Sequence, residues 1–417
     1  MNNLRVEQVG RSGRALRQIF LVFLTLVLAA ALTLPGKAAG PQDYESLRLL
    51  TEAFYEISQK FVAKKGEEEM IYGSLRGLVN SLDPDSSFLT PKEYQEYLSG
   101  DKGPVAEAGL ELIFKDQLLT VVSALDGGPA FRAGLRPGDH ILKIDGKPVR
   151  NLTTQEAARR FQGKAGNSLK LQVLRNGLVK PLDLTVILEN LAPSSVTAQV
   201  VQDAYAYVRI RAFMDATPAQ LATALKNLQR HVPPLKGVVL DLRNNARGAM
   251  EQAIRTAAVF LGDREILSTK GRSPQSTQTY QGKGREQVFK PALPMVVLVD
   301  QGTARAAEIV AAALKDQGQA VLLGAKTLGL CGLTKVLPLE DGSALIITVA
   351  QCYTPKGQKI QGKGLEPEVA GKSPPVEAAA AKELAAPLAP DQDPWVIQAV
   401  DFLKAGKPAQ VAKKEAP

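Results

Sequence analysis

The chain has 417 residues, 45% of them hydrophobic and 22% charged, and this length predicts two or three domains rather than one core. Its two histidines, His140 and His231, nearly exclude a histidine-based zinc site and leave a Ser/His/Asp triad only those two residues. The net charge of +9 is modest, so a basic solvated surface, facing water or anionic lipid, is favoured over nucleic-acid binding. We expect neither a metal nor a cofactor.

Residues 1–40 carry the features of an export segment. Arginines precede an apolar run over 19–34, and small residues follow it. This order is typical of a secretory signal, with Gly36-Lys37-Ala38 as a cleavage tripeptide. The run is slightly short for a bilayer span, and an uncleaved membrane anchor is the alternative.

Residues 41–102 read as a helical region. Apolar residues between Leu47 and Phe61 recur at three- and four-residue steps, which predicts an amphipathic helix. This helix either docks on its own domain or forms a dimer. A second helix over 70–82 ends at residues 83–87, where Asp-Pro-Asp-Ser-Ser predicts a turn and the cap of a fresh helix.

The rest of the chain changes character twice. Within 103–190, short β-like runs at 110–114, 118–122, 141–144, 169–174 and 182–188 surround one helix at 153–161, capped by Thr153 or Thr154. Within 191–370, buried strands at 238–242 and 295–299 precede helices at 250–260 and 304–314, and a hairpin turns at 340–342. Residues 371–417 read as an Ala/Pro-rich linker, a short amphipathic helix and a disordered charged end.

An ordered series of motifs carries a family resemblance. The stretches are GSLRGL at 73–78, LDP at 82–84, GPA at 128–130, AGLRPGD at 133–139, IDG at 144–146, DLRNN at 241–245, DGSAL at 341–345 and YTPKGQKIQG at 353–362. From residue 44 to 370 the chain resembles the carboxy-terminal processing, or tail-specific, proteases, which are periplasmic serine proteases with an embedded PDZ domain. The resemblance implies an α/β fold: a spiral ββα core of the crotonase or Clp-protease kind, an inserted PDZ domain and an N-terminal helical region.

That family uses a Ser/Lys dyad, and the matching positions differ here. The nucleophile position of its Ser-Ala-Ser-Ala-Ser-Glu-like motif is Arg305, the general-base position is Leu330, and the supporting glutamine position is Thr334. Asp316 matches a family acidic residue or is simply a polar residue near a helix end. A guanidinium is no nucleophile and leucine accepts no proton, so we expect no catalytic residue.

Two further features bear on catalysis. The family's Asn-Pro-Gly-Gly loop reads Asn-Ala-Arg-Gly at 245–248, which places Arg247 where a glycine lets a backbone N–H face the oxyanion. A substitute dyad of Thr303 and Lys326 is the alternative to lost catalysis. Thr303 directly precedes a helical run, and its favoured role is therefore that helix's N-cap.

The two cysteines, too few for a disulfide scaffold, gain meaning from the same alignment. Cys331 directly follows the base position. A hairpin turning at 340–342 would set Cys331 nearly opposite Cys352, where neighbouring Cβ atoms are about 4.5–5.5 Å apart. An oxidising periplasm favours a disulfide over two buried free thiols. This disulfide would stabilise the fold by roughly 3 kcal/mol.

The PDZ-like segment keeps its peptide-binding features. Residues 107–112 resemble the carboxylate-binding loop and first groove strand, and the helix over 153–161 would form the other wall. The peptide-binding residues implied are Gly109, Leu110, Glu111, Leu112, Ala157 and Phe161. The alternative is a domain kept only for packing.

Taken together, the sequence predicts domains at 1–40, 41–102, 103–190, 191–370 and 371–417. We expect an inactive homologue, periplasmic or anchored in the inner membrane facing the periplasm. It would bind protein C-termini or unfolded peptide as scaffold, adaptor or regulator, alone or in an oligomer with itself or an active relative. The alternatives are an active serine-type endopeptidase with a non-standard site, and a structural remnant that self-associates through its N-terminal helices.

Overall fold

The computed structural model describes residues 41–99, 106–150, 152–191, 194–230, 234–282, 293–372 and 388–406. The export segment at 1–40, His231, most of the predicted linker and the charged end after 406 lie outside these residues. The chain divides after residue 71 into two compact units, which are taken separately below. In the described part of the chain, no helix combines the length and apolar character needed to cross a bilayer.

The first unit contains helix α2 (Pro41–Lys60), and α3 (Glu67–Asn80) begins in it. The amphipathic helix expected around residues 47–61 is therefore confirmed. Its apolar positions stay open, since Leu47, Leu50 and Ile57 are 61%, 57% and 51% exposed. Docking and dimerisation through this face both stay predictions.

The turn after α3 differs from expectation. The Asp83 carboxylate accepts the N–H groups of Asp85 and Ser86, each at 2.9 Å, and closes a tight turn. The buried strand β1 (Ser87–Leu89) follows and pairs antiparallel with β18. The predicted helix cap here is wrong, because pairing with β18 takes residues 87–89. Helix α4 (Pro91–Ser99) starts one turn later, with reciprocal bonds between Thr90 and Glu93.

Residues 106–187 fold into a small β-rich domain. Its sheet has the order β3-β4-β5-β8-β9, with β6 on β5, and β2 pairs with β7 outside it. The elements are β2 (Ala106–Glu107), β3 (Leu110–Lys115), β4 (Leu118–Ala124), α5 (Pro129–Arg132), β5 (His140–Ile144), β6 (Lys147–Pro148), α6 (Thr154–Arg160), β7 (Gln162–Gly163), β8 (Ser168–Leu174) and β9 (Leu182–Ile187). All five predicted strands are confirmed. Thr153 caps α6, and Glu156 completes a capping box.

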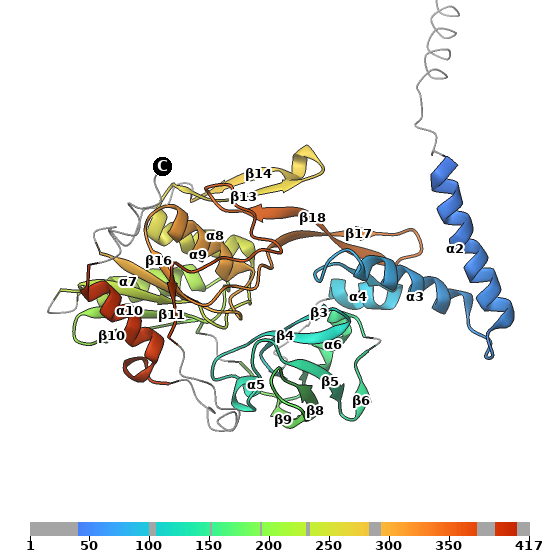
Figure 1. Ribbon diagram of the computed structural model, residues 1–417, viewed down its shortest axis with the longest axis horizontal. Coiled ribbons are helices and arrows are strands. Elements are labelled where there is room, and N and C mark those ends of the chain that lie inside the picture. The colour runs from blue at the N-terminus through green and yellow to red at the C-terminus, as the bar shows by residue number, and fades with distance from the viewer. Residues whose placement is uncertain are drawn as a thin grey trace, which may run out of the picture. The chain divides into compact units, whose positions relative to one another are not determined.

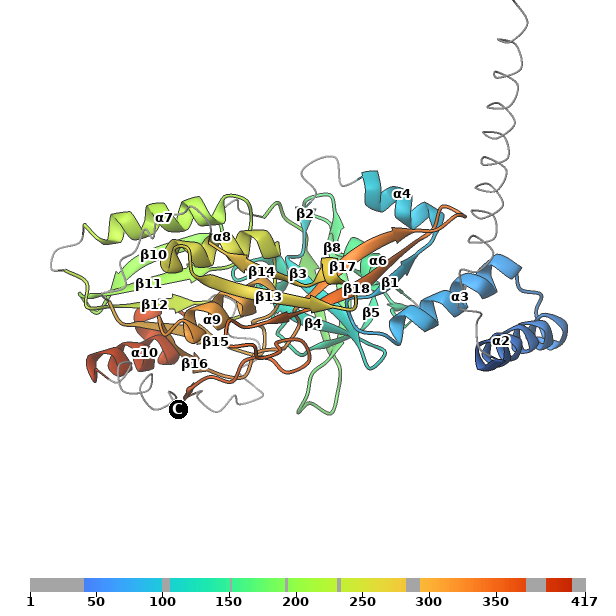
Figure 2. The ribbon, with the colours of Figure 1, turned by 90° about the horizontal axis from the view of Figure 1, so that it is seen from above.

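The larger domain is built on a six-stranded sheet of order β10-β11-β12-β15-β16-β19, parallel except for β10. Its apolar strands are buried on both faces: α7, α8 and α9 pack on one and α10 on the other (Figure 2). The elements are β10 (Val196–Val201), β11 (Tyr205–Ile210), α7 (Thr217–Leu228), β12 (Gly237–Asp241), α8 (Met250–Leu261), β15 (Met295–Val299), α9 (Ala306–Asp316), β16 (Val321–Gly324), β19 (Val369–Ala370), the short helix η3 (Pro390–Gln392) and α10 (Pro394–Lys404).

A second sheet extends from this domain, with order β1-β18-β13-β14 and β17 also paired to β18 (Figure 1). Its remaining elements are β13 (Glu265–Gly271), the short helix η1 (Pro274–Ser276), β14 (Gln278–Gln281), β17 (Gly332–Pro338) and β18 (Ala344–Tyr353). The predicted hairpin is confirmed: the N–H of Leu339 donates to Ser343 O at 2.8 Å, and β17 runs antiparallel to β18.

Candidate functional site

Arg305 lies in the turn between β15 and α9, at the position that the resemblance assigns to the nucleophile. Its φ of +52° and ψ of −118° form a conformation that costs a non-glycine residue about 1–3 kcal/mol. Its N–H donates to Leu330 O at 2.9 Å. The structure therefore places the positions assigned to nucleophile and base side by side.

The Arg305 guanidinium is held by two carboxylates. It donates to Asp85 at 2.8 Å and to Glu111 of strand β3 at 3.0 Å. Burial alone would lower the pKa of Arg305, but the charges of Glu111 and Asp85 raise it above its ordinary value. Burial raises the pKa of Glu111, while the Arg305 and Arg247 guanidiniums oppose that rise. The side chain at this position is a fixed cation that links α3–β1, the PDZ-like domain and the larger domain.

Glu308 is the polar hub behind this turn and is fully buried. Its carboxylate accepts four hydrogen bonds: from Thr327 Oγ1 at 2.5 Å and from the N–H groups of Gly329, Leu330 and Arg305 at 2.8, 2.9 and 3.2 Å. Burial raises the pKa of Glu308 to about 7, although these donors favour its charged form. Glu308 thus fixes the backbone of both loops that carry the assigned dyad positions.

Leu330 packs where the resemblance implies a lysine amine. Its side chain is 4% exposed and belongs to an apolar cluster. The other buried members are Ile113 and Val122 from the PDZ-like domain and Ala246 and Ala304 from the larger domain. The position assigned to the base is therefore part of a hydrophobic contact between two domains.

The loop after β12, which the resemblance assigns to the oxyanion site, also contacts the PDZ-like domain. The Arg247 guanidinium pairs with the Glu107 carboxylate of the PDZ-like domain at 2.6 Å. The backbone carbonyl of Arg247 accepts the N–H of Phe213. The next residue, Gly248, has φ +117°, and a Cβ there would lie 2.3 Å from Phe213 O. The loop keeps its close backbone approach at Gly248, but the preceding position carries a long cation engaged in an ion pair.

A cavity of about 270 Å³ lies beside Arg305, and Thr334 lines it as well. Apolar atoms of Met250 and Ile309 form other parts of its wall. Asp316 does not line this cavity: it ends α9, and its carboxylate accepts the N–H of Lys356 at 2.9 Å. The structure brings Thr334 to Arg305 and gives Asp316 a local contact near a helix end.

The residues of the alternative dyad are engaged elsewhere. Thr303 is fully buried, and its hydroxyl contacts Leu242 O at 3.0 Å and the Asp300 carboxylate at 3.1 Å. Lys326 pairs with Glu366 at 2.6 Å. Thr303 is not the helix cap that the sequence predicted, because the sharp turn at Arg305 delays α9 until Ala306.

Cys331 and Cys352 form a disulfide, as predicted, with Cα atoms 5.5 Å apart. The N–H of Cys352 donates to Cys331 O at 3.1 Å, which places them opposite each other at the end of the β17–β18 hairpin. Both are at most 3% exposed and line the cavity beside Arg305. The disulfide therefore fixes one wall of that cavity.

The predicted peptide groove has the layout of a PDZ groove. Strand β3 lies at the edge of its sheet and contacts α6. Ala157 and Phe161 are 0% and 3% exposed and pack with Leu112 in the domain core, while Leu110 is half-buried. The N–H groups of Glu107 and Ala108 donate within the domain, to Glu189 O and Phe161 O. Any strand added to β3 must therefore use backbone groups beyond these two.

Comparisons with known proteins agree with this architecture. Residues 106–186 match a PDZ domain and residues 204–370 match Peptidase family S41. Over 358 residues the chain is 33% identical to a carboxy-terminal-processing protease of Bartonella bacilliformis, which covers 85% of this chain and 81% of that protein. The chain belongs to the carboxy-terminal processing protease family.

Other members of the family are similar over most of their length. The carboxy-terminal processing protease CtpA of Bacillus subtilis is 30% identical over 87% of this chain and 78% of its own. The solved photosystem II D1 C-terminal processing protease superposes with a TM-score of 0.66 and 25% identity, over 83% of this chain and 98% of its own. The expected α/β fold with an inserted PDZ domain and N-terminal helices is confirmed.

Sequence reasoning missed the partners of the positions that the resemblance assigns to the catalytic site. It singled out Arg305, Leu330 and Arg247 but assigned them no contact with the PDZ domain. The available signal was charge: the cations Arg247 and Arg305 match Glu107 and Glu111, which flank the predicted groove loop. The pairs Arg247–Glu107 and Arg305–Glu111 are 140 and 194 residues apart in sequence, so only the fold reveals them.

Proposed function

We propose that this member of the carboxy-terminal processing protease family lacks peptidase activity and holds peptide segments through its PDZ domain, as a periplasmic scaffold, adaptor or regulator. The observation that carries the proposal is the side chain at the nucleophile position. Arg305 is a protonated guanidinium fixed between Asp85 and Glu111, and it has no nucleophilic oxygen. The neighbouring Leu330 accepts no proton.

The surroundings support the same proposal. Loss of the catalytic residues of a serine protease lowers turnover by a factor on the order of 10⁶. Here the base position is buried under Ile113 and Val122 of the PDZ domain. Thr303 and Lys326, the substitute dyad of an active enzyme, each have other partners. These contacts favour the inactive form over an endopeptidase with a non-standard site.

Peptide binding rests on the PDZ edge strand. Among the described strands of its sheet, β3 pairs only with β4, and its other edge lies beside α6, where an extended peptide would add as an extra strand. Leu110 is half-buried at the start of this strand, and under this proposal it would contact the last residues of a peptide. The export features of residues 1–40 support a periplasmic location, with the segment either cleaved or kept as an anchor.

The test is a binding and labelling experiment on the purified full chain. Fluorescence anisotropy with a library of peptide C-termini should find ligands whose affinity falls at least tenfold in Leu110→Lys, since the charged side chain enters an apolar groove. The matched control is Leu118→Lys, at the 38%-exposed far end of the same domain, which should bind like the wild type. A serine-directed covalent probe should label no residue.

Two results would contradict the proposal. Labelling by the serine probe that is lost when the labelled residue is replaced would favour an active endopeptidase. Failure to bind any peptide in the library would favour the structural remnant that self-associates through α2.

A further inference from the structure

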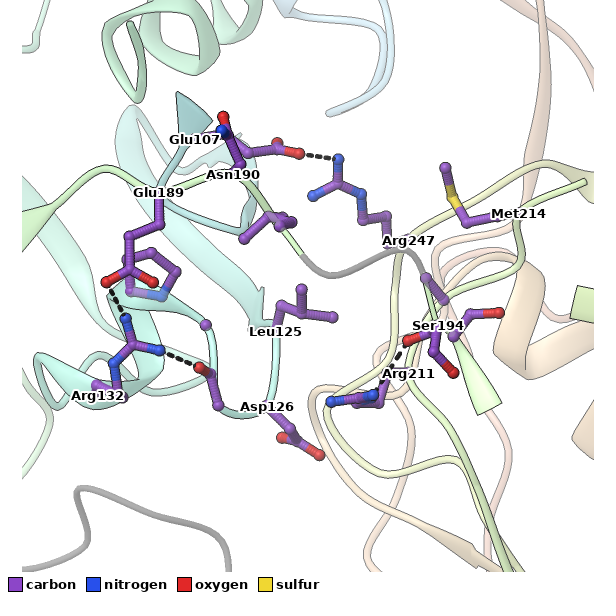
Figure 3. A pocket seen from close by; sticks show the side chains of 16 residues that line it. Glu107, Leu125, Asp126, Arg132, Glu189, Asn190, Ser194, Arg211, Met214 and Arg247 are labelled. Carbon is purple, nitrogen blue, oxygen red and sulfur yellow. Dashed lines mark hydrogen bonds and ion pairs between the residues drawn. The ribbon is translucent and has the colours of Figure 1, made fainter. Parts of the chain in front are cut away.

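A second cavity, of about 420 Å³, lies between the PDZ domain and the larger domain. Neither Arg305 nor Leu330 lines it, nor do Ala157 and Phe161, which the sequence assigned to the groove, so it is separate from the Arg305 site and from the predicted groove. Figure 3 shows side chains converging on it from the two domains. Those used below are Leu125, Arg132 and Glu189 on the PDZ side and Arg211, Met214 and Arg247 on the other.

The acidic side chains around this cavity are all matched by cations. The ion pairs are Glu107–Arg247, Glu189–Arg132 and Asp126–Arg209. Asp126 also accepts a hydrogen bond from Asn244 Nδ2 at 2.9 Å. Each carboxylate of the described lining thus has a cationic partner, and the lining holds one further arginine.

Arg211 is that further arginine. Within the described residues its guanidinium makes no ion pair, and its one hydrogen bond is to Ser194 O at 3.0 Å (Figure 3). Its Nε is buried and has no partner among the described residues, and the same is true of Arg247 Nη1. A buried donor without an acceptor is unfavourable, and a guanidinium offers five donors in a planar fork. Arg211 therefore lines the cavity without an ion pair of its own, and two buried guanidinium N–H groups at its wall lack an acceptor among the described residues.

We propose that this cavity binds a carboxylate of a peptide segment, either an Asp or Glu side chain or a free C-terminus. The planar guanidinium fork matches a carboxylate, and such charge-assisted bonds are among the strongest in proteins. Leu125 and Met214 add apolar wall for the carbon atoms next to the charge, and the volume lies within the range of small-ligand pockets, about 300–1,000 Å³. This inference rests on the proposed function only in taking a peptide as the ligand.

The position of the cavity gives the bound carboxylate a structural effect. Arg211 and Arg247 belong to the larger domain, whereas Arg132 and Leu125 belong to the PDZ domain. A peptide seated here contacts both domains and stabilises the arrangement in which they meet. It does so without occupying the edge of β3.

The experiment uses the full chain and three fluorescein-labelled peptides of one length. The first carries Leu and Glu and is amidated, the second has Gln for every Glu and is amidated, and the third is the Gln peptide with a free C-terminal carboxylate. By anisotropy, the first or the third should bind at least tenfold more tightly than the second. Affinity of the carboxylate peptide should also fall as NaCl is added, since the contact is ionic.

Arg211→Gln should remove the preference for the carboxylate peptide while keeping the thermal unfolding of the wild type. The matched control is Arg272→Gln, an exposed arginine outside the cavity, which should keep the full preference. Equal binding of all three peptides, or an unchanged preference in Arg211→Gln, would overturn the inference. Displacement of the peptide by equimolar inorganic phosphate would overturn the assignment to a carboxylate.

One further comparison separates this inference from the proposed function. If the carboxylate peptide loses affinity in Leu110→Lys but not in Arg211→Gln, it sits in the PDZ groove. That result would overturn the inference and support groove binding. Loss in Arg211→Gln with normal binding in Leu110→Lys is the result expected for the cavity.

Discussion

The PDZ domain differs from the loops of the larger domain that face it in how well each matches the family pattern. In the PDZ domain the groove layout is intact, with β3 at the sheet edge and α6 beside it. In the facing loops, Arg305 and Arg247 form ion pairs with PDZ carboxylates, and Leu330 joins an apolar cluster with PDZ side chains. The contrast teaches that residues at the positions that the resemblance assigns to catalysis contact a neighbouring domain.

A large effect that would sharpen this contrast is expected at Glu308. In Glu308→Gln, the amide N–H₂ must face a backbone N–H donor, which leaves the buried N–H of Leu330 unpaired, whereas the N–H of Arg305 keeps Leu330 O as its acceptor. We expect the free energy of unfolding to fall by roughly 1–3 kcal/mol, the cost of one unpaired buried donor. Urea unfolding measures this; a change below about 0.5 kcal/mol would contradict the hub role.

The same residue gives a pH dependence. The folded pKa of about 7 lies above the ordinary value of 4.5, so between these values the folded chain holds a proton that the unfolded chain has released. Glu308 therefore contributes a loss of stability, roughly 3 kcal/mol in all, as pH rises from about 4.5 through 7. Unfolding measured across this range should show a falling component that Glu308→Gln lacks. Identical pH slopes in the two proteins would contradict it.

Leu330→Ala tests the apolar side of the contact between the domains. Because Leu330 is buried in a cluster shared by both domains, we expect the free energy of unfolding to fall by about 3 kcal/mol. The control Leu339→Ala, at a 37%-exposed position in the hairpin turn, should cost less than about 0.5 kcal/mol. Equal losses of unfolding free energy in the two variants would contradict a stabilising role for this cluster.

The Cys331–Cys352 disulfide should contribute about as much to the free energy of unfolding as the Leu330 side chain does. Replacing Cys331 and Cys352 by Ala opens a loop of sequence separation 21 and should lower stability by about 3 kcal/mol. Reductant should destabilise the wild type and leave the double variant unchanged. Two free thiols in denatured, unreduced protein would show that the bond is absent.

Arg305→Ala should have the smallest global effect, about 1 kcal/mol, because its side chain is 29% exposed and solvent screens the ion pairs. Its local effect should be clear. Loss of the bonds to Asp85 and Glu111 should speed hydrogen exchange of the amides in β3 and β4. Arg255→Ala, which breaks an exposed pair within α8, should leave that exchange unchanged. Unaltered hydrogen exchange in Arg305→Ala would contradict the conclusion that Arg305 holds the PDZ domain.

Local patterns in the sequence predicted much of this molecule. The alternation of short apolar runs located the PDZ strands, the threonines at 153 and 154 marked the start of α6, and the hairpin register paired Cys331 with Cys352. Each of these depends on neighbours in sequence or on one turn.

The predictions that were wrong or missing depend on residues far apart in the sequence. Thr303 is a good helix cap by type, but its hydroxyl is taken by Leu242 O, and the turn at Arg305 delays the helix. Asp85 meets Arg305 across 220 residues of chain, which no local pattern encodes. The roles of Thr303 and Asp85 therefore depend on side-chain and backbone partners that only the fold brings together.

Cleavage of a peptide with a free apolar C-terminus, followed by mass spectrometry, tests most directly whether Arg305 has replaced a working nucleophile. The purified full chain, cleared of host proteases, should give no products above buffer while still binding the peptide. Specific products that disappear in Arg305→Ala would contradict the account, because they would show that an intact Arg305 site supports catalysis.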